Sequence, residues 1–152
     1  MWEIVKSFRF EAAHTLSGTT LGPDAEHVHG HSFRAEVAVR GRPDPKTGMV
    51  KDFGALDAEL AEIRRTLDHR LLNRIDGLAT PTLEVLARYI YDRIAPKQNL
   101  ARVTVYRDSC GESCSYFGED RRYSLLLQLR VLSGFARETG WRRTSRFMST
   151  SW

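Results

Sequence analysis

The fold is decided by residues 29–40, which read His-Gly-His-Ser-Phe-Arg-Ala-Glu-Val-Ala-Val-Arg. The odd-numbered positions carry two histidines and then apolar side chains, whereas most even-numbered positions carry polar or charged ones. Because the side chains of a β-strand alternate between its two faces, this pattern predicts a strand with one buried face. Two histidines therefore begin an otherwise apolar strand face.

A second stretch with the same alternation, residues 4–14, lies upstream. Its even-numbered positions include Ile4, Phe8, Phe10, Ala12 and His14. The pattern predicts a strand whose buried face ends in His14. Antiparallel pairing of the two strands would bring His14 beside His29 and His31.

Helical spacing follows a predicted turn at residues 44–48 and a predicted short strand over 49–53. A first helix over about 54–67 is indicated by Leu56, Leu60, Ile63 and Leu67, and a second by Leu86, Ile90 and Ile94. For the second helix we expect Thr80 as the N-cap, Pro81 at the first position and Pro96 as the stop. The alternation of side chains between two faces returns at residues 101–107 and 115–117, which are predicted to form the last two strands. The sequence thus predicts an α+β domain in the order strand, strand, helix, helix, strand, strand.

Length and composition indicate one soluble domain. The chain has 152 residues, 41% hydrophobic and 28% charged, and no apolar run near the roughly 18 residues that a membrane span needs. Its first residues lack the features of a secretory signal, so we expect a cytoplasmic protein with no membrane partner. Cys110 and Cys114 are too few for a disulfide framework.

The net charge of +4 lies entirely in the C-terminal tail. Residues 1–118 hold 16 basic and 16 acidic side chains, whereas residues 119–152 hold seven arginines and three acids. A neutral core without a basic stripe argues against nucleic acid as the main partner. We assign residues 1–118 to the folded domain and expect residues 119–152 to form either an additional helix or strand or a disordered basic tail.

The histidines form a candidate metal site. A His-x-His pair directs both imidazoles to one side of a strand, and three imidazoles with one open position are a usual arrangement for catalytic Zn²⁺. The alternative is that His14, His29 and His31 are polar strand ends, but unpaired imidazoles on an apolar face would be costly. His27 has the same parity and is interpreted as a loop residue that could compete as a ligand.

Several spaced motifs occur in one order along residues 3–118. They are Phe10-Glu11-Ala12-Ala13-His14, His29-Gly30-His31-Ser32-Phe33, Asp52-Phe53, Leu67-Asp68-His69, Leu72-Asn73 and Thr80-Pro81-Thr82 to Glu84. Together they resemble the 6-pyruvoyl-tetrahydropterin and 6-carboxy-tetrahydropterin synthase family. The resemblance implies the tunnelling fold: a four-stranded antiparallel sheet with two helices on one face, assembled into homohexamers with active sites at subunit interfaces.

The resemblance also implies roles for individual residues. His14, His29 and His31 match the zinc ligands, Asp68 and His69 match the acid–base pair, and Thr80 and Thr82 resemble threonines that contact the pterin. Zinc would polarise the side-chain oxygens of 7,8-dihydroneopterin or its triphosphate, the expected substrates. The enzyme would then be a carbon–oxygen or carbon–carbon lyase in queuosine or folate biosynthesis. Without the resemblance, Asp68-His69 would be interpreted as a helix end with a cation near the dipole.

The sequence departs from the family pattern at the catalytic cysteine. In the 6-carboxy type this cysteine stands four residues before the first histidine of His-Gly-His, and here that position is Ala25. Glu26 follows in a Glu-x-x-His-Gly-His arrangement that resembles a third branch of the family, which cleaves dihydroneopterin to 6-hydroxymethyl-dihydropterin. A carboxylate can accept a hydroxyl proton and so start a retro-aldol cleavage. The alternative for Glu26 is a solvated loop acid.

A second departure is Asp108, where the family places a glutamate that grips the pterin's guanidine-like edge. Aspartate is one methylene shorter, so Asp108 either binds the ring from a shifted backbone, favours another heterocycle, or is a surface acid. Two rival functions therefore stay open beside the lyase. One is a catalytically impaired zinc protein that binds a pterin or purine, and the other is an interaction module that reaches RNA through its basic tail.

Overall fold

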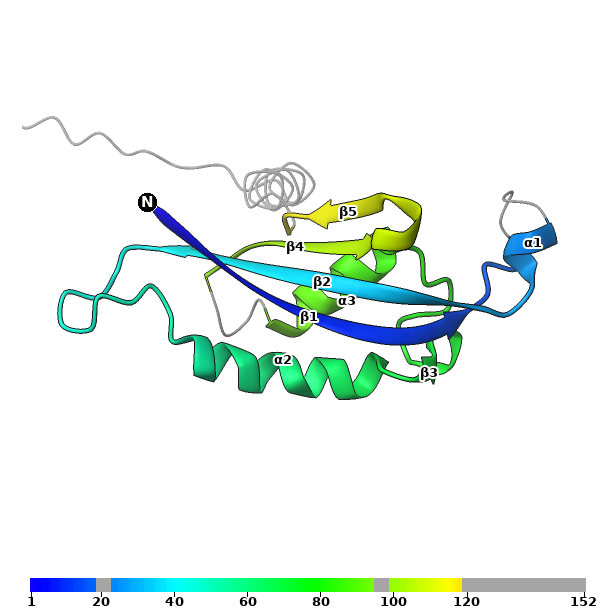
Figure 1. Ribbon diagram of the computed structural model, residues 1–152, viewed down its shortest axis with the longest axis horizontal. Helices are drawn as coiled ribbons and strands as arrows, with labels where there is room; N and C mark the ends of the chain where they lie inside the picture. The colour runs from blue at the N-terminus through cyan, green and yellow to red at the C-terminus, as the bar shows by residue number, and fades with distance from the viewer. Residues whose placement is uncertain (19–22, 95–98, 119–152) are drawn as a thin grey trace, which may run out of the picture. The chain divides into compact units, whose positions relative to one another are not determined.

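A computed structural model describes residues 1–18, 23–94 and 99–118 (Figure 1). The elements are β1 (Trp2–His14), α1 (Pro23–Glu26), β2 (His29–Gly41), α2 (Phe53–Leu67), β3 (Arg70–Leu71), α3 (Leu83–Ile94), β4 (Leu100–Arg107) and β5 (Glu112–Tyr116). Short 3-10 turns occupy Leu72–Arg74 and Asp108–Cys110. In the described part of the chain no helix has the length and apolar character to cross a membrane. The predictions for the tail 119–152 and for Pro96 fall outside the described residues.

Over the described residues, the sheet has five strands in the order β3-β1-β2-β4-β5. β1 and β2 form a long antiparallel ribbon whose register runs from Trp2 opposite Gly41 to His14 opposite His29. β4 pairs antiparallel with β2, and β5 with β4. The four longer strands therefore match the predicted strands and their order, including the pairing that joins the histidine ends.

The prediction of a four-stranded, wholly antiparallel sheet is wrong because of β3. This two-residue strand runs parallel to β1, with Arg70 opposite Ala12. The backbone N–H of His69 donates to the carbonyl of Glu11 (2.6 Å), and the backbone N–H of Glu11 donates to a carboxylate oxygen of Asp68 (2.9 Å). The chain leaving α2 is thus attached to the edge of β1, over a segment too short to show a periodic pattern.

Both longer helices pack against one face of the sheet, here called the helix face. The shared core combines the inward side chains of the strands with one stripe from each helix. On β1 and β2 it includes Phe10, Phe33, Ala35 and Val37; on α2, Leu56, Leu60, Ile63 and Leu67; and on α3, Leu86, Ile90 and Ile94. The predicted helical stripes are confirmed. Each buried aliphatic side chain of this kind contributes on the order of 2 kcal/mol by leaving water.

Two local predictions around the helices are wrong. Residues 49–52 form no strand, because the Asp44 N–H donates to the Met49 carbonyl (2.9 Å), closing a tight loop, and the Asp52 carboxylate then caps α2 by accepting from Gly54 (2.9 Å). Helix α3 begins at Leu83, so Thr80 and Pro81 precede it. The hydroxyl of Thr82 accepts from the backbone of Val85 (3.4 Å).

The opposite side of the sheet, here called the polar face, carries charged side chains that pair with one another. Glu3 accepts from Arg40 (2.7 Å) and from Arg102 (3.2 Å). Glu36 accepts from Arg34 and from the hydroxyl of Tyr106 (3.0 Å). The alternation seen in the sequence thus produces two different faces. The helix face is apolar and ends in histidines, whereas the polar face carries ion pairs.

Candidate metal centre and active site

The register of β1 and β2 brings three histidines together at one end of the helix face. His14 lies directly opposite His29, and His31 follows two residues later on the same face. The ring centroids are 4.6 Å apart for His14 and His29, 5.1 Å for His14 and His31, and 4.9 Å for His29 and His31. One nitrogen from each ring lies within 4.8 Å of the others, so the three could hold a metal ion. The predicted convergence is confirmed.

Hydrogen bonds indicate which nitrogens face the centre. Nδ1 of His14 lies 3.0 Å from the carbonyl oxygen of Pro81, and Nδ1 of His29 lies 2.8 Å from that of His27. A carbonyl oxygen only accepts, so each Nδ1 carries the proton and each Nε2 keeps its lone pair. Nε2 of His14 is buried and has no hydrogen-bond partner among the residues that the structure describes. These are the tautomers that a metal ion bound through Nε2 requires.

The electrostatics at the histidines favour neutral imidazoles. Burial lowers the pKa of His14, and burial with the nearby Arg107 guanidinium lowers the pKa of His31 to about 4. A neutral imidazole is the form that binds a metal, so these rings do not need to lose a proton first at neutral pH. His27 is exposed and lies outside the cluster, as expected for a loop residue.

A cavity of about 340 Å³ opens beside His14. Its lining combines apolar groups with Thr82, Glu84, Arg107 and Glu112. Arg107 points a guanidinium nitrogen to within 3.3 Å of Nε2 of His31 and pairs with Glu112, while its Nε is buried and has no partner in the described part of the chain. A hydrogen bond from the hydroxyl of Thr82 lowers the pKa of Glu84. The cavity thus combines the metal-binding face with fixed charges of both signs.

Sequence analysis assigned no site role to Arg107, Glu84 or Glu112. A signal for Arg107 was present, because this charged residue shares parity with Val103 and Val105 on β4. That is the same signature of a polar group on an apolar face that identified His14. Glu84 appears in the sequence only as part of the family motif.

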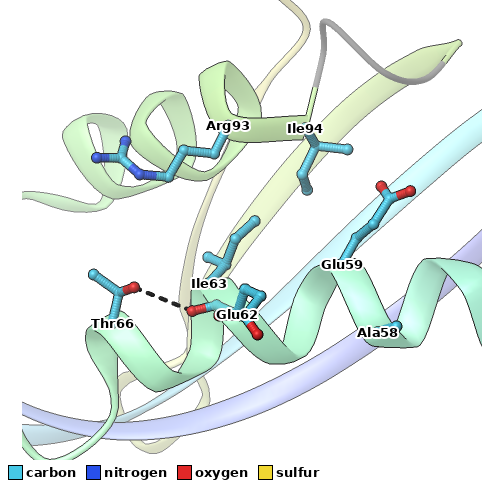
Figure 2. A pocket seen from close by; sticks show the side chains of 7 residues that line it. All are labelled: Ala58, Glu59, Glu62, Ile63, Thr66, Arg93 and Ile94. Carbon is cyan, nitrogen blue, oxygen red and sulfur yellow. Dashed lines mark hydrogen bonds between the residues drawn. The ribbon is translucent and has the colours of Figure 1, made fainter.

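A larger hollow of about 460 Å³ lies between α2 and α3. Figure 2 shows its lining, including Thr66, whose hydroxyl donates to the backbone oxygen of Glu62 one turn earlier (3.1 Å). None of the predicted site residues lines this hollow. Size alone therefore does not identify the candidate site.

The predicted acid–base pair is in contact. Nδ1 of His69 lies 3.1 Å from a carboxylate oxygen of Asp68, and the backbone N–H of Glu11 lowers the pKa of Asp68. His69 has a φ of 55°, and its side chain is 79% exposed. Neither residue lines the cavity beside His14. The two side chains are thus in contact at the edge of β1, with the imidazole directed to solvent, and their acid–base role stays a prediction.

The family sequence model described as 6-pyruvoyl tetrahydropterin synthase matches residues 3–119. The chain belongs to this family. The 6-carboxy-5,6,7,8-tetrahydropterin synthase of Synechocystis is 38% identical over 124 residues, covering 77% of this chain and 94% of that protein. A dihydroneopterin monophosphate aldolase of Pyrococcus furiosus is 37% identical over 91 residues, covering 60% and 73%. The solved 6-pyruvoyl tetrahydropterin synthase of Caenorhabditis elegans superposes with a TM-score of 0.68 at 26% identity, covering 78% of this chain and 96% of that one.

Within this tetrahydropterin synthase fold, the position expected for the cysteine lies beside the histidine strand. Ala25 accepts a backbone hydrogen bond from Leu16 (2.8 Å), and the carbonyl of Glu26 accepts from the hydroxyls of Thr15 (2.7 Å) and Ser17 (3.3 Å). Helix α1 is thereby attached to the residues that directly follow His14. The side chain of Glu26 is exposed.

The two cysteines do not replace the missing thiolate. Cys110 is exposed and Cys114 is half-buried, and both are free. Burial, together with the nearby Glu84 carboxylate, raises the pKa of Cys114 above its ordinary value, which disfavours the reactive thiolate. Neither residue lines the cavity beside His14.

The predicted substrate-binding residues are separated in this chain. Thr82 lines the cavity beside His14, whereas Thr80 is exposed and does not. Asp108 lies after the end of β4, and both of its carboxylate oxygens accept hydrogen bonds from Arg34, a residue of the polar face. The structure therefore brings together His14, His29, His31 and Thr82, and leaves Asp108 apart from that cavity.

Proposed function

We propose that the protein is a zinc-dependent lyase that cleaves the side chain of 7,8-dihydroneopterin or a phosphorylated form of it, releasing 6-hydroxymethyl-dihydropterin. The observation that carries this proposal is the combination of a three-histidine cluster with Ala25 at the cysteine position and Glu26 next to it. One of the similar proteins is named as an aldolase for dihydroneopterin monophosphate, so that chemistry occurs among the relatives.

Zinc is the cation that we propose for the cluster. Three neutral imidazoles suit Zn²⁺ and leave one position for a substrate oxygen. When bound, it supplies a Lewis acid that polarises the side-chain oxygens of the substrate. The buried, unpartnered Nε2 of His14 supports this assignment, because a buried nitrogen without a partner is otherwise costly.

Residues of the protein would accept and donate the protons of the reaction. The Glu26 carboxylate accepts the proton from the hydroxyl on the second side-chain carbon, and the bond between the first and second carbons breaks. The second carbon leaves as an aldehyde, and its bonding electrons stay on the first carbon, conjugated with the dihydropterin ring. A protonated His69, oriented by Asp68, returns a proton to the first carbon. Protons and electrons then balance, with Glu26 gaining one proton and His69 losing one.

For Glu26 and His69 to act at one site, the protein would have to form a homo-oligomer. His69 is largely exposed and does not line the cavity beside His14, so the imidazole that serves a given cluster would come from a neighbouring copy of the chain. We propose the homohexamer with interfacial active sites that the family resemblance implies. We also propose a cytoplasmic location, which the two free cysteines support.

Product analysis tests the proposed reaction. Zinc-loaded protein is incubated with dihydroneopterin, its monophosphate and its triphosphate, and the products are identified by mass spectrometry. We expect 6-hydroxymethyl-dihydropterin together with a two-carbon aldehyde or its phosphate. Formation of 6-carboxy- or 6-pyruvoyl-tetrahydropterin instead would refute the proposed bond cleavage. Ring binding without turnover would support the rival function of a pterin- or purine-binding protein.

A Glu26→Gln variant tests the base. Loss of a general base lowers kcat by a factor of about 10² to 10⁴, while zinc content stays unchanged because Glu26 is not a proposed ligand. Glu62→Gln, which changes an exposed acid on α2, is the matched control and should keep wild-type kcat. Wild-type activity in Glu26→Gln would remove Glu26 from the mechanism.

A further inference from the structure

Arg107 connects the histidine cluster to the hairpin of β4 and β5. It is the last residue of β4 and lies directly opposite Glu112, the first residue of β5. One terminal nitrogen of its guanidinium pairs with Glu112, and the other lies 3.3 Å from Nε2 of His31. The side chain of Arg107 is 22% exposed, so the hairpin holds the guanidinium against the cluster and largely out of solvent.

The contact between Arg107 and His31 has one possible direction. A guanidinium has donors and no acceptor, so Nε2 of His31 is the acceptor and its lone pair is directed to Arg107. The proton of this neutral ring then lies on Nδ1, as it does in His14 and His29, whose Nδ1 atoms face carbonyl oxygens. Arg107 therefore keeps His31 in the tautomer that binds a metal ion through Nε2.

One lone pair cannot serve an arginine and a cation at the same time. A metal ion binds an imidazole through the lone pair that accepts from Arg107 here, and the charge of the ion repels the guanidinium. We propose that Arg107 is an exchangeable partner of the metal cluster, which occupies Nε2 of His31 until a cation displaces it and thereby sets the affinity of the three histidines for zinc. This inference rests on the zinc site of the proposed function.

Arg107 keeps a partner when it releases His31. Its ion pair with Glu112 does not involve the imidazole, and both residues line the cavity of about 340 Å³, which gives the released guanidinium room to turn. At 3.3 Å the bond to His31 is longer than most hydrogen bonds of this kind, so the need to break it lowers zinc affinity by only about three- to tenfold. Arg107 acts through His31 and is a positioning residue, not a catalytic one.

Zinc titration of the full-length protein, in competition with a chromophoric chelator, tests the exchange. We expect Arg107→Met to lower the Kd for zinc by about three- to tenfold, because the lone pair of His31 is then free. Arg107→Met/Glu112→Gln keeps the net charge of the pair at zero and should retain this gain. A gain that disappears in the double variant would reflect local charge alone and would overturn the exchange. Arg102→Met is the matched control, because Arg102 is also 22% exposed on β4 but pairs with Glu3 on the polar face, and its zinc Kd should equal that of wild type.

Nitrogen NMR of the imidazole rings provides a second readout, which needs no metal. At neutral pH, His31 of the zinc-free wild type should be a single Nδ1–H tautomer, and Arg107→Met should convert it into a mixture of the two neutral tautomers. The rings of His14 and His29 are internal controls, because their carbonyl partners remain in the variant. Wild-type zinc affinity or an unchanged His31 tautomer in a folded Arg107→Met protein would overturn the proposal. Absence of any reaction product would refute the proposed lyase and leave the exchange standing, whereas absence of zinc binding would refute both.

Discussion

The two faces of strand β2 handle polar groups in opposite ways. On the polar face, Arg34 and Glu36 have partners on neighbouring strands or turns. On the helix face, polar groups gather at one end and remain incompletely paired. Over the described ranges, the buried side-chain nitrogen and oxygen atoms without a partner are Nε2 of His14 and Nε of Arg107, and both belong to residues that line the cavity.

This difference separates charged groups that pair with one another and stabilise the fold from polar groups that are candidates for function. Buried polar atoms are almost always hydrogen-bonded, and an unpaired one costs about 1–3 kcal/mol. Two such atoms in residues that line one cavity therefore mark it as the candidate binding site. The ion pairs of the polar face need no such partner.

The largest effect is expected from removing a cluster histidine. His31→Ala should lower metal affinity by more than about a hundredfold, the upper range for losing a group that merely supports a ligand. His27→Ala is the matched control, because the hydrogen bond from His29 is to the backbone oxygen of His27 and survives the change. Metal content after gel filtration measures both. Equal metal retention by the two variants would contradict the assignment of the ligands.

A core substitution on the helix face should come next. Leu60 is 1% exposed and packs within the shared core, so Leu60→Ala should lower the free energy of unfolding by about 2–5 kcal/mol. Urea denaturation measures the change. A loss below about 1 kcal/mol would mean that α2 does not pack against the sheet as described.

The alternation of residues 4–14 and 29–40 was sufficient to predict the histidine cluster. Pairing two such strands with their apolar faces on the same side places His14, His29 and His31 on one face, and the observed register, with His14 opposite His29, brings the three together. The buried stripes of α2 and α3 were equally predictable, because each of the two helices spans more than three turns.

Other features depend on individual hydrogen bonds, which produce no periodic pattern in the sequence. Strand β3 exists because the backbone of His69 bonds to Glu11, and α3 begins later than predicted, after Pro81 directs its carbonyl to His14. The pairing of Asp108 with Arg34 joins residues 74 positions apart and needs the register of β2 and β4. The sequence alone could not supply these long-range contacts.

A moderate effect with a defined pH dependence is expected at Asp68, where the sheet edge meets α2. Its pKa is lowered chiefly by the hydrogen bond from Glu11, so its carboxylate stabilises the fold above the ordinary pKa of about 3.9, and this contribution is lost as the pH falls through the lowered value. Asp68→Asn should cost about 1 kcal/mol at pH 7 and progressively less in acid. Denaturation across pH measures this. A difference that stays constant down to pH 2 would show that the charge is not responsible.

The smallest effect is expected on the polar face. Arg40 is 59% exposed and pairs with Glu3, and such ion pairs contribute no more than about 1 kcal/mol. Arg40→Ala should therefore change the free energy of unfolding by no more than about half of the Leu60→Ala effect, in the same urea assay. Comparable losses of unfolding free energy in the two variants would contradict the proposed difference between the polar face and the helix face.

X-ray absorption spectroscopy of the zinc-loaded protein tests the central claim most directly. We expect about one zinc per chain, coordinated by three imidazole nitrogens at about 2.0–2.1 Å, with a light atom in the fourth position and no sulfur. A sulfur ligand, fewer than three imidazoles, or failure to bind any divalent metal under all loading conditions would contradict it.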